Sequence, residues 1–221
     1  MKNVTDRITN PFDMRPPCPG AEGEQAAVFG YGDANADFHV VGDHPGVHGG
    51  CETGVPFTGS PAGERLRSVL NEVGLVADRD GDGDGPAVAN LFLSYRYMCC
   101  LADDRAPTDR EYDDLEPFFD AELRAIAAHV LLPVGEAATR HVLATYGARA
   151  ALVDDRGMAE LHADHVPGSG FLVVPIREPT EWTDADRERL AASLSELLDS
   201  DYRQTADLSR FLAGDETYEV R

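Results

Sequence analysis

Two glycine-rich segments hold the side chains of this chain that are best suited to chemistry. The first, GDHPG at 42–46, follows the apolar run Phe38–Val41, and the second, GVPFTGSPAG at 54–63, holds the aromatic side chain of Phe57. Glycine and proline let a backbone turn sharply off the end of a strand and approach a ligand closely. Such loops suit a flat ring, because the aromatic side chain offers a stacking face.

Regular elements on either side must position these loops. The residues at 36–41 predict a buried strand, and apolar residues at helical spacing predict a helix at 61–73. A second strand is expected at 87–93, ending near Asn90. Since open α/β sheets bind ligands at the carboxyl ends of their strands, we expect the polar residues of both loops to meet there.

Strand-like and helix-like segments continue to alternate along the chain. Thr108 and Glu111 form a capping box that begins another helix. Further strands are predicted at 129–134 and 171–175, and further helices at 136–146 and 184–198. This order predicts an α/β fold, a three-layer αβα sandwich with a central four-stranded, mainly parallel sheet.

One domain is expected, at residues 36–198. An N-terminal extension at 1–35 precedes it, and an acidic C-terminal tail at 199–221 follows it. The alternating aspartates at 78–85 begin like a calcium-binding loop, but Ala89 stands where the bidentate glutamate is required. We therefore expect a solvated loop there.

The charge of the chain is strongly negative. The formal net charge is −21, and Lys2 is the only lysine among the fixed cations. Acidic surfaces almost free of lysine are expected in a cell with molar internal salt, where self-repulsion is screened within a few ångströms, although a generic acidic protein is the alternative. The charge argues only weakly against a nucleic-acid partner. No apolar run is long enough to span a membrane, and the N-terminus lacks an apolar signal core, so we expect a cytoplasmic protein.

Four cysteines, Cys18, Cys51, Cys99 and Cys100, form no CxxC pair. Their spacing alone does not support a zinc site. In a cytosolic protein, we expect them to be reduced thiols that are partly buried.

The order of the motifs resembles the uracil-DNA glycosylase superfamily, most closely its family 4, which carries an iron–sulfur cluster. The matching series runs through residues 11–198 and includes GDHPG, GVPFTGSPAG, VANLFLSYRYMCC, RAPTDREYDDLEPFF, LLPVGEAA and VVPIREPTEW. The resemblance implies a central four-stranded parallel sheet flanked by helices. It also implies that a uracil is flipped out of DNA, stacked on an aromatic ring, read by an asparagine and cut from its sugar as water adds.

The resemblance assigns roles to particular residues. Phe57 would stack the base, Asn90 would hydrogen-bond its edge, and Gly42 and Gly46 would shape the loop against it. Asp43 or His44 would act near the attacking water. The alternatives are that Phe57 is a core aromatic, that Asn90 is a turn residue, and that Asp43 and His44 only hold the loop in place.

Two departures from the family pattern bear on activity. A late His-Pro motif is replaced by Arg177-Glu178-Pro179-Thr180, so Glu178 stands where a histidine would donate a hydrogen bond to the developing uracil anion. An ionised Glu178 would repel that anion, unless Arg177 replaces the donor or Glu178 is protonated. Losing such a donor costs about 3–4 kcal/mol.

The second departure concerns the iron–sulfur cluster, which requires four thiolates. The resemblance matches Cys18 to one of the first two ligands and Cys99 or Cys100 to the third, while Leu115 stands at the fourth position. Cys51, in the loop between the glycine motifs, is a poor substitute. We expect no cofactor, with these cysteines as remnants of a cluster site.

The resemblance thus implies a uracil-DNA glycosylase of base excision repair, a hydrolase of the N-glycosidic bond of uracil or another deaminated base in DNA. We expect it to be a monomer that binds damaged DNA and no membrane, from a halophilic archaeon. The alternative is a catalytically impaired relative that binds DNA or a nucleobase without excising it.

Overall fold

A mixed sheet of six strands forms the centre of the molecule in the computed structural model, which describes residues 12–18, 27–77, 85–102, 105–147, 149–168 and 170–200. Its strand order is β1-β5-β2-β6-β8-β7. The strands are β1 (Tyr31–Gly32), β2 (Phe38–Gly42), β5 (Leu91–Tyr95), β6 (Val130–Pro133), β7 (Val166–Pro167) and β8 (Leu172–Val173). The middle four are parallel, and the two short edge strands pair antiparallel. The predicted four-stranded parallel core is thus present, with an added strand at each edge.

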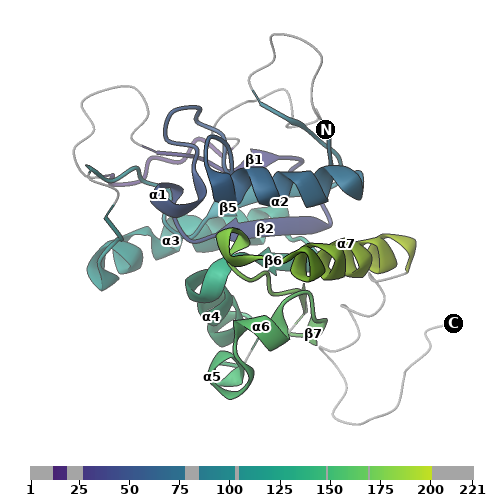
Figure 1. The fold of residues 1–221 in the computed structure, drawn as a ribbon. Coiled ribbons are helices and arrows are strands. Elements are labelled where there is room, and N and C mark those ends of the chain that lie inside the picture. Colours follow the sequence, from purple (N-terminus) through teal and green to yellow (C-terminus); the bar gives the residue numbers. More distant parts are fainter. Residues whose placement is uncertain are drawn as a thin grey trace, which may run out of the picture.

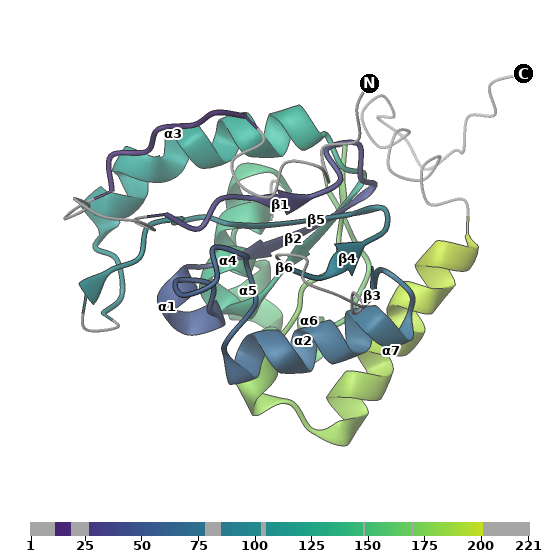
Figure 2. The same ribbon diagram turned by 90° about the horizontal axis from the view of Figure 1, so that it is seen from above.

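Helices cover both faces of this sheet (Figure 1). They are α1 (Pro45–His48), α2 (Pro61–Glu72), α3 (Asp109–Ile126), α4 (Gly135–Thr145), α5 (Leu152–Arg156), α6 (Met158–Leu161), the 3-10 turn η3 (Pro179–Glu181) and α7 (Asp184–Asp199). Seen from above, α3 lies on one side of the sheet, and α2 and α7 lie on the other (Figure 2). This arrangement confirms the three-layer α/β sandwich expected from the sequence.

Local sequence signals explain where the long helices begin. The Thr108 hydroxyl accepts a hydrogen bond from the backbone of Glu111, and the Glu111 carboxylate accepts one from the backbone N–H of Thr108, which confirms the predicted capping box of α3. Thr183 and Asp186 form a second capping box at α7. Ser60 caps α2 just before a proline at its first position.

The parallel register brings four strand ends to one edge of the sheet. Phe38 lies beside Leu91 and Gly42 beside Tyr95, so β2 and β5 end together. Strand β6 ends at Pro133. Val134, which follows β6, forms a parallel bridge with Ile176, which follows β8. The loops after these strands therefore converge, as the predicted site requires.

The predicted strand at 87–93 is wrong in its bounds, and this moves Asn90. The segment divides into β4 (Ala87–Val88), which pairs with β3 (Val76–Ala77) in a small second sheet, and β5. Asn90 separates them with a left-handed φ of 54°, and its side-chain oxygen accepts a hydrogen bond from the backbone of Asp37 at 2.8 Å. Asn90 thus lies at the beginning of β5, at the edge of the sheet opposite to the converging loops.

The cysteines are not the reduced thiols that we expected. Cys18 is bonded to Cys99, and Cys51 is bonded to Cys100. The expectation was wrong because disulfide pairing depends on which distant segments the fold brings together, and the spacing of cysteines along a chain does not show this. The two bonds tie the N-terminal segment and the loop before Phe57 to the chain that follows β5.

Several expectations lie outside the described residues. These are the solvated acidic loop at 78–84, the acidic tail at 201–221 and most of the N-terminal extension. Among the residues that the structure does describe, no helix has the length and apolar character needed to cross a membrane.

Candidate active site

The loops after β2 and β5 hold Asp43 in a fixed position. The Tyr112 hydroxyl of α3 donates a hydrogen bond to the Asp43 carboxylate at 2.8 Å, and the Arg96 guanidinium lies 3.4 Å from the same oxygen. That guanidinium also stacks over the Tyr112 ring, 4.5 Å from its centroid. The backbone of Asp43 accepts a hydrogen bond from Tyr97. Asp43 is therefore a half-buried carboxylate that its neighbours orient.

His44 is the next residue and lies at the beginning of α1. It is buried, and burial lowers the pKa of its imidazole below the ordinary value, which outweighs the opposite effect of Asp43 beside it. The ring is therefore neutral at pH 7 and able to accept a proton. Asp43 and His44 lie where the sequence placed them, after the carboxyl end of β2.

Phe57 is packed among other rings. Its ring lies 5.3 Å from that of His48, at an interplanar angle of 30°, and 5.1 Å from that of Tyr95. Gly42 permits this packing, because a Cβ there would come within 2.6 Å of the Tyr95 ring and 2.7 Å of Phe57. The exposed fraction of Phe57 is 0% and that of His48 is 1%. A base could stack on Phe57 only after one of these neighbours has moved.

Tyr95 is a residue of the site that the sequence analysis missed. Its hydroxyl donates a hydrogen bond to the backbone oxygen of Gly49 at 2.8 Å and accepts one from the backbone N–H of Phe57 at 2.7 Å. Burial raises its pKa well above the ordinary value, so the phenol is neutral. Tyr95 occupies the carboxyl end of β5, the place expected for Asn90, and counting the strand from Leu91 would have found it.

His48, the last residue of α1, was also missed. One ring nitrogen, Nδ1, accepts a hydrogen bond from the backbone N–H of Asp43 at 3.3 Å, and the other, Nε2, lies 3.1 Å from the carboxylate oxygen Oε2 of Glu178. The proton therefore resides on Nε2, which donates to Glu178. These partners are 130 residues apart in the chain, so no local motif indicated their contact.

Glu178 is ionised in this arrangement. Burial acts to raise its pKa, but hydrogen bonds from His48 and Thr180 outweigh burial, and the pKa lies below the ordinary value for glutamate. The Thr180 hydroxyl lies 3.4 Å from the second carboxylate oxygen. A protonated Glu178, which would have relieved repulsion of an anionic base, does not fit this geometry.

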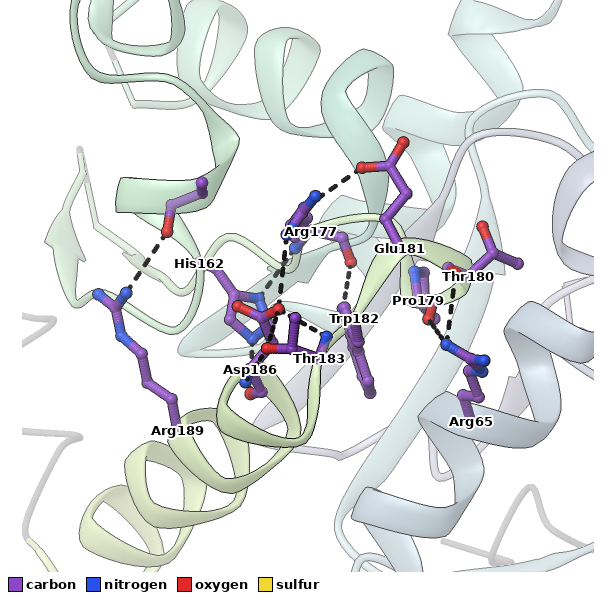
Figure 3. A network of polar contacts seen from close by, with 11 residues as sticks. Arg65, His162, Arg177, Pro179, Thr180, Glu181, Trp182, Thr183, Asp186 and Arg189 are labelled. Carbon is purple, nitrogen blue, oxygen red and sulfur yellow. Dashed lines mark hydrogen bonds and ion pairs between the residues drawn. The ribbon is translucent and has the colours of Figure 1, made fainter.

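Arg177 directs its guanidinium to other partners. It lies 3.2 Å from the Glu181 carboxylate and 3.4 Å from that of Asp186 in α7 (Figure 3). Its backbone N–H donates to His162, and its carbonyl oxygen accepts from the Trp182 indole. Arg177 thus fastens the segment that carries Glu178 to α7, which does not fit the predicted role of a replacement donor.

Arg65 of α2 fastens the other side of the same segment. Its guanidinium donates to the backbone oxygens of Pro179 at 3.1 Å and Thr180 at 3.3 Å (Figure 3). The backbone on both sides of Glu178 is consequently fastened to α2 and α7.

The residues present do not fit a four-thiolate iron–sulfur cluster. Cys18 and Cys99 pack in one hydrophobic cluster with Leu115, which stands at the position of the fourth ligand, and they are bonded to each other. Cys51 and Cys100 are bonded to each other and pack against a different cluster, the one that holds Phe57. We therefore assign no step of the chemistry to such a cluster.

The fold agrees with the comparison with known proteins. The model of the uracil DNA glycosylase superfamily matches residues 29–195. The chain belongs to this superfamily. It is 31% identical over 155 residues to a type-5 uracil-DNA glycosylase of Pyrobaculum aerophilum, which is 68% of this chain and 64% of the relative.

Two further relatives carry the same name. A type-5 uracil-DNA glycosylase of Thermus thermophilus is 31% identical over 55% of this chain and 56% of its own length. That of Mycobacterium leprae is 31% identical over 47% and 45%. The chain thus spans 45% to 64% of the length of these three relatives.

Proposed function

We propose that this protein is a DNA glycosylase of base excision repair that hydrolyses the bond between a flipped uracil, or another deaminated base, and its deoxyribose. The type-5 names of the relatives support this reaction, and the closeness to family 4 expected from the motifs stays a prediction. The observation that carries the proposal is the position of Asp43, His44 and Phe57 together at the carboxyl ends of β2 and β5. DNA is the partner, bound by a single copy of the chain.

The site residues suggest a division of roles. Phe57 offers its face to the base, and the oriented carboxylate of Asp43 stabilises positive charge that develops on the sugar as the bond breaks. Neutral His44 accepts a proton from the water that adds to the sugar carbon. The electron pair of the broken bond remains on the base, which leaves as an anion and is protonated later.

Excision from uracil-containing oligonucleotides, single- and double-stranded, tests this function across potassium chloride concentrations from low to molar. Asp43→Asn and Phe57→Ala should each lower the single-turnover rate by roughly a hundredfold or more. Asn90→Ala should retain the native rate, since Asn90 lies at the opposite edge of the sheet. Native rates in Asp43→Asn and Phe57→Ala, in protein shown to be folded, would contradict the proposal.

A second function, binding without excision, is favoured by one observation. The ionised Glu178 beside His48 opposes the departure of an anionic base. Under this alternative, the native protein retards uracil-containing DNA in a binding assay but releases no base at any salt concentration. Measurable release that depends on Asp43 would exclude it.

The acidic composition supports a proposal about the cell as well. We propose that the protein acts in the cytoplasm of a halophile, where molar salt screens repulsion between a chain of net charge −21 and the phosphates of DNA. Its affinity for DNA should then depend weakly on salt compared with that of a basic glycosylase.

A further inference from the structure

The proposed reaction requires a hydrogen-bond donor that this site does not obviously supply. The leaving base gains negative charge as its bond to the sugar breaks, and fixed donors stabilise such charge. The ionised carboxylate of Glu178 instead lies beside His48, which packs on the Phe57 ring. An anion placed near this carboxylate is repelled unless a donor lies closer to it than the carboxylate does.

Among the described residues, two ring side chains that pack against Phe57 carry a donor, Tyr95 and His48, and the His48 proton is not given to the loop backbone. The Tyr95 hydroxyl gives its proton to the backbone oxygen of Gly49 and so holds the loop itself. The His48 proton resides on Nε2, because the backbone N–H of Asp43 fills the lone pair of Nδ1. That proton is directed at an oxygen of Glu178, 3.1 Å from Nε2.

The oxygen Oε2 of Glu178 occupies a position that favours negative charge. It accepts the His48 proton, and a Cβ added to Gly135 would lie 3.3 Å from it, which places it beside the first residue of α4. The N-terminus of an eleven-residue helix stabilises an anion. An anionic oxygen of a leaving base would be stabilised there by the same two features.

We propose that His48 is the donor to the leaving base, and that Glu178 holds the His48 proton until the base arrives. This inference rests on the proposed function. As the base enters against Phe57, the His48 ring moves off the Phe57 face, and a carbonyl oxygen of the base replaces Oε2 of Glu178 as the acceptor of Nε2–H. His48 is then a catalytic residue, and Glu178 is its competing acceptor in the free protein.

Two variants separate these roles. His48→Phe retains a ring that packs on Phe57 but has no donor, and single-turnover excision should fall by roughly a hundredfold to a thousandfold. Glu178→Gln retains the shape but removes the charge, and excision should rise severalfold, because a neutral amide competes less for the proton and does not repel the base. Asn71→Ala, at an exposed position on α2, is the matched control and should be unchanged.

Binding of free uracil, measured by calorimetry, gives a readout that does not need cleavage. Uracil should bind more tightly to Glu178→Gln than to the native protein and more weakly to His48→Phe. A folded His48→Phe protein with native excision and native uracil binding would overturn the inference. So would a Glu178→Gln protein as impaired as His48→Phe, because Glu178 would then support the donor.

The same measurements separate this inference from the proposed function. A native protein that binds uracil in the predicted order of variants but excises nothing would uphold the role of His48 and reject the glycosylase. Excision by the native protein that is unchanged in His48→Phe would uphold the glycosylase and reject the role of His48. A native protein that neither binds uracil nor excises it would reject both.

Discussion

At the scale of single residues, the packing around Phe57 leaves almost no spare volume. Gly42 lies against both Tyr95 and Phe57, and Phe57 itself has a left-handed φ of 60° that a non-glycine residue adopts only when its surroundings enforce it. The sequence indicated Gly42, Asp43, His44 and Phe57 because they lie in two short motifs. It could not indicate His48, whose contact with Glu178 joins segments that are distant in the chain, and it missed Tyr95 because the bounds of β5 were misplaced.

A methyl group at Gly42 should therefore disturb the site. Gly42→Ala would place its Cβ 2.6 Å from the Tyr95 ring, and overpacking of this kind costs about 1–3 kcal/mol. We expect a lower free energy of unfolding and a larger relative loss of excision, measured by urea denaturation and by single-turnover kinetics. Native values for both would show that the Tyr95 and Phe57 rings move aside at little cost in free energy.

Two buried titratable groups should give the protein a measurable pH dependence. His39, on β2, contacts the Ser94 hydroxyl at 2.7 Å, and burial lowers its pKa to about 3. Burial raises the pKa of Glu122, on α3, to about 8. Stability falls as the pH drops below 6.5, because the unfolded chain then binds a proton at His39 that the folded state does not bind. Stability also falls as the pH rises from 4.5 to about 8, because the folded state retains a proton on Glu122 that the unfolded chain has lost.

Between pH 6.5 and 8.5, Glu122 is the group of this pair whose titration still changes the free energy of unfolding. The free energy of unfolding should fall across that interval by on the order of 2 kcal/mol, as measured by urea denaturation at a series of pH values. Glu122→Gln cannot ionise and should flatten the slope. An equal slope in native protein and variant would contradict the assignment to Glu122.

At the scale of elements, the sequence predicted the helices and the central strands well where local signals specify them. The capping box at Thr108 and the apolar face of α2 are encoded within a few residues, and both were found. The strand around Asn90 was misplaced because apolar residues lie on both sides of Asn90, whose left-handed φ separates β4 from β5. The short edge strands β1 and β7 contain two residues each, too few for a periodic pattern.

The disulfide between Cys51 and Cys100 should stabilise the loop that carries His48 and Phe57. It closes a segment of 49 residues, for which the chain-entropy estimate is about 4 kcal/mol. Cys51→Ser with Cys100→Ser should lower the melting temperature and the excision rate together. Thiol titration of the denatured native protein provides the control, since all four cysteines are bonded and none should react.

At the scale of the whole molecule, charge outweighs any single contact. With 40 acidic and 19 basic side chains, excluding histidine, the folded state repels itself wherever salt does not screen it. The many ion pairs of the described surface, such as Arg140 with Asp154, offset this only locally.

Stability should consequently rise with salt. We expect the melting temperature to increase steadily from about 0.1 M to 2 M potassium chloride, over which the screening length falls from about 10 Å to below 3 Å. An osmolyte such as sucrose at equal osmotic strength is the control for general exclusion effects. A flat salt profile would mean that self-repulsion contributes little to stability.

The disulfides of the adjacent cysteines Cys99 and Cys100 also determine whether a protease can release a fragment of the chain. One is bonded back to Cys18 and the other to Cys51, so the backbone and the two bonds form overlapping closed rings. A protease that nicks the chain once at any peptide bond from Cys18 to Cys100 would release no fragment, and the product would keep the mass of the intact protein plus one water until it was reduced. The segment that carries most of the proposed active site would thus survive a single break as one covalent molecule.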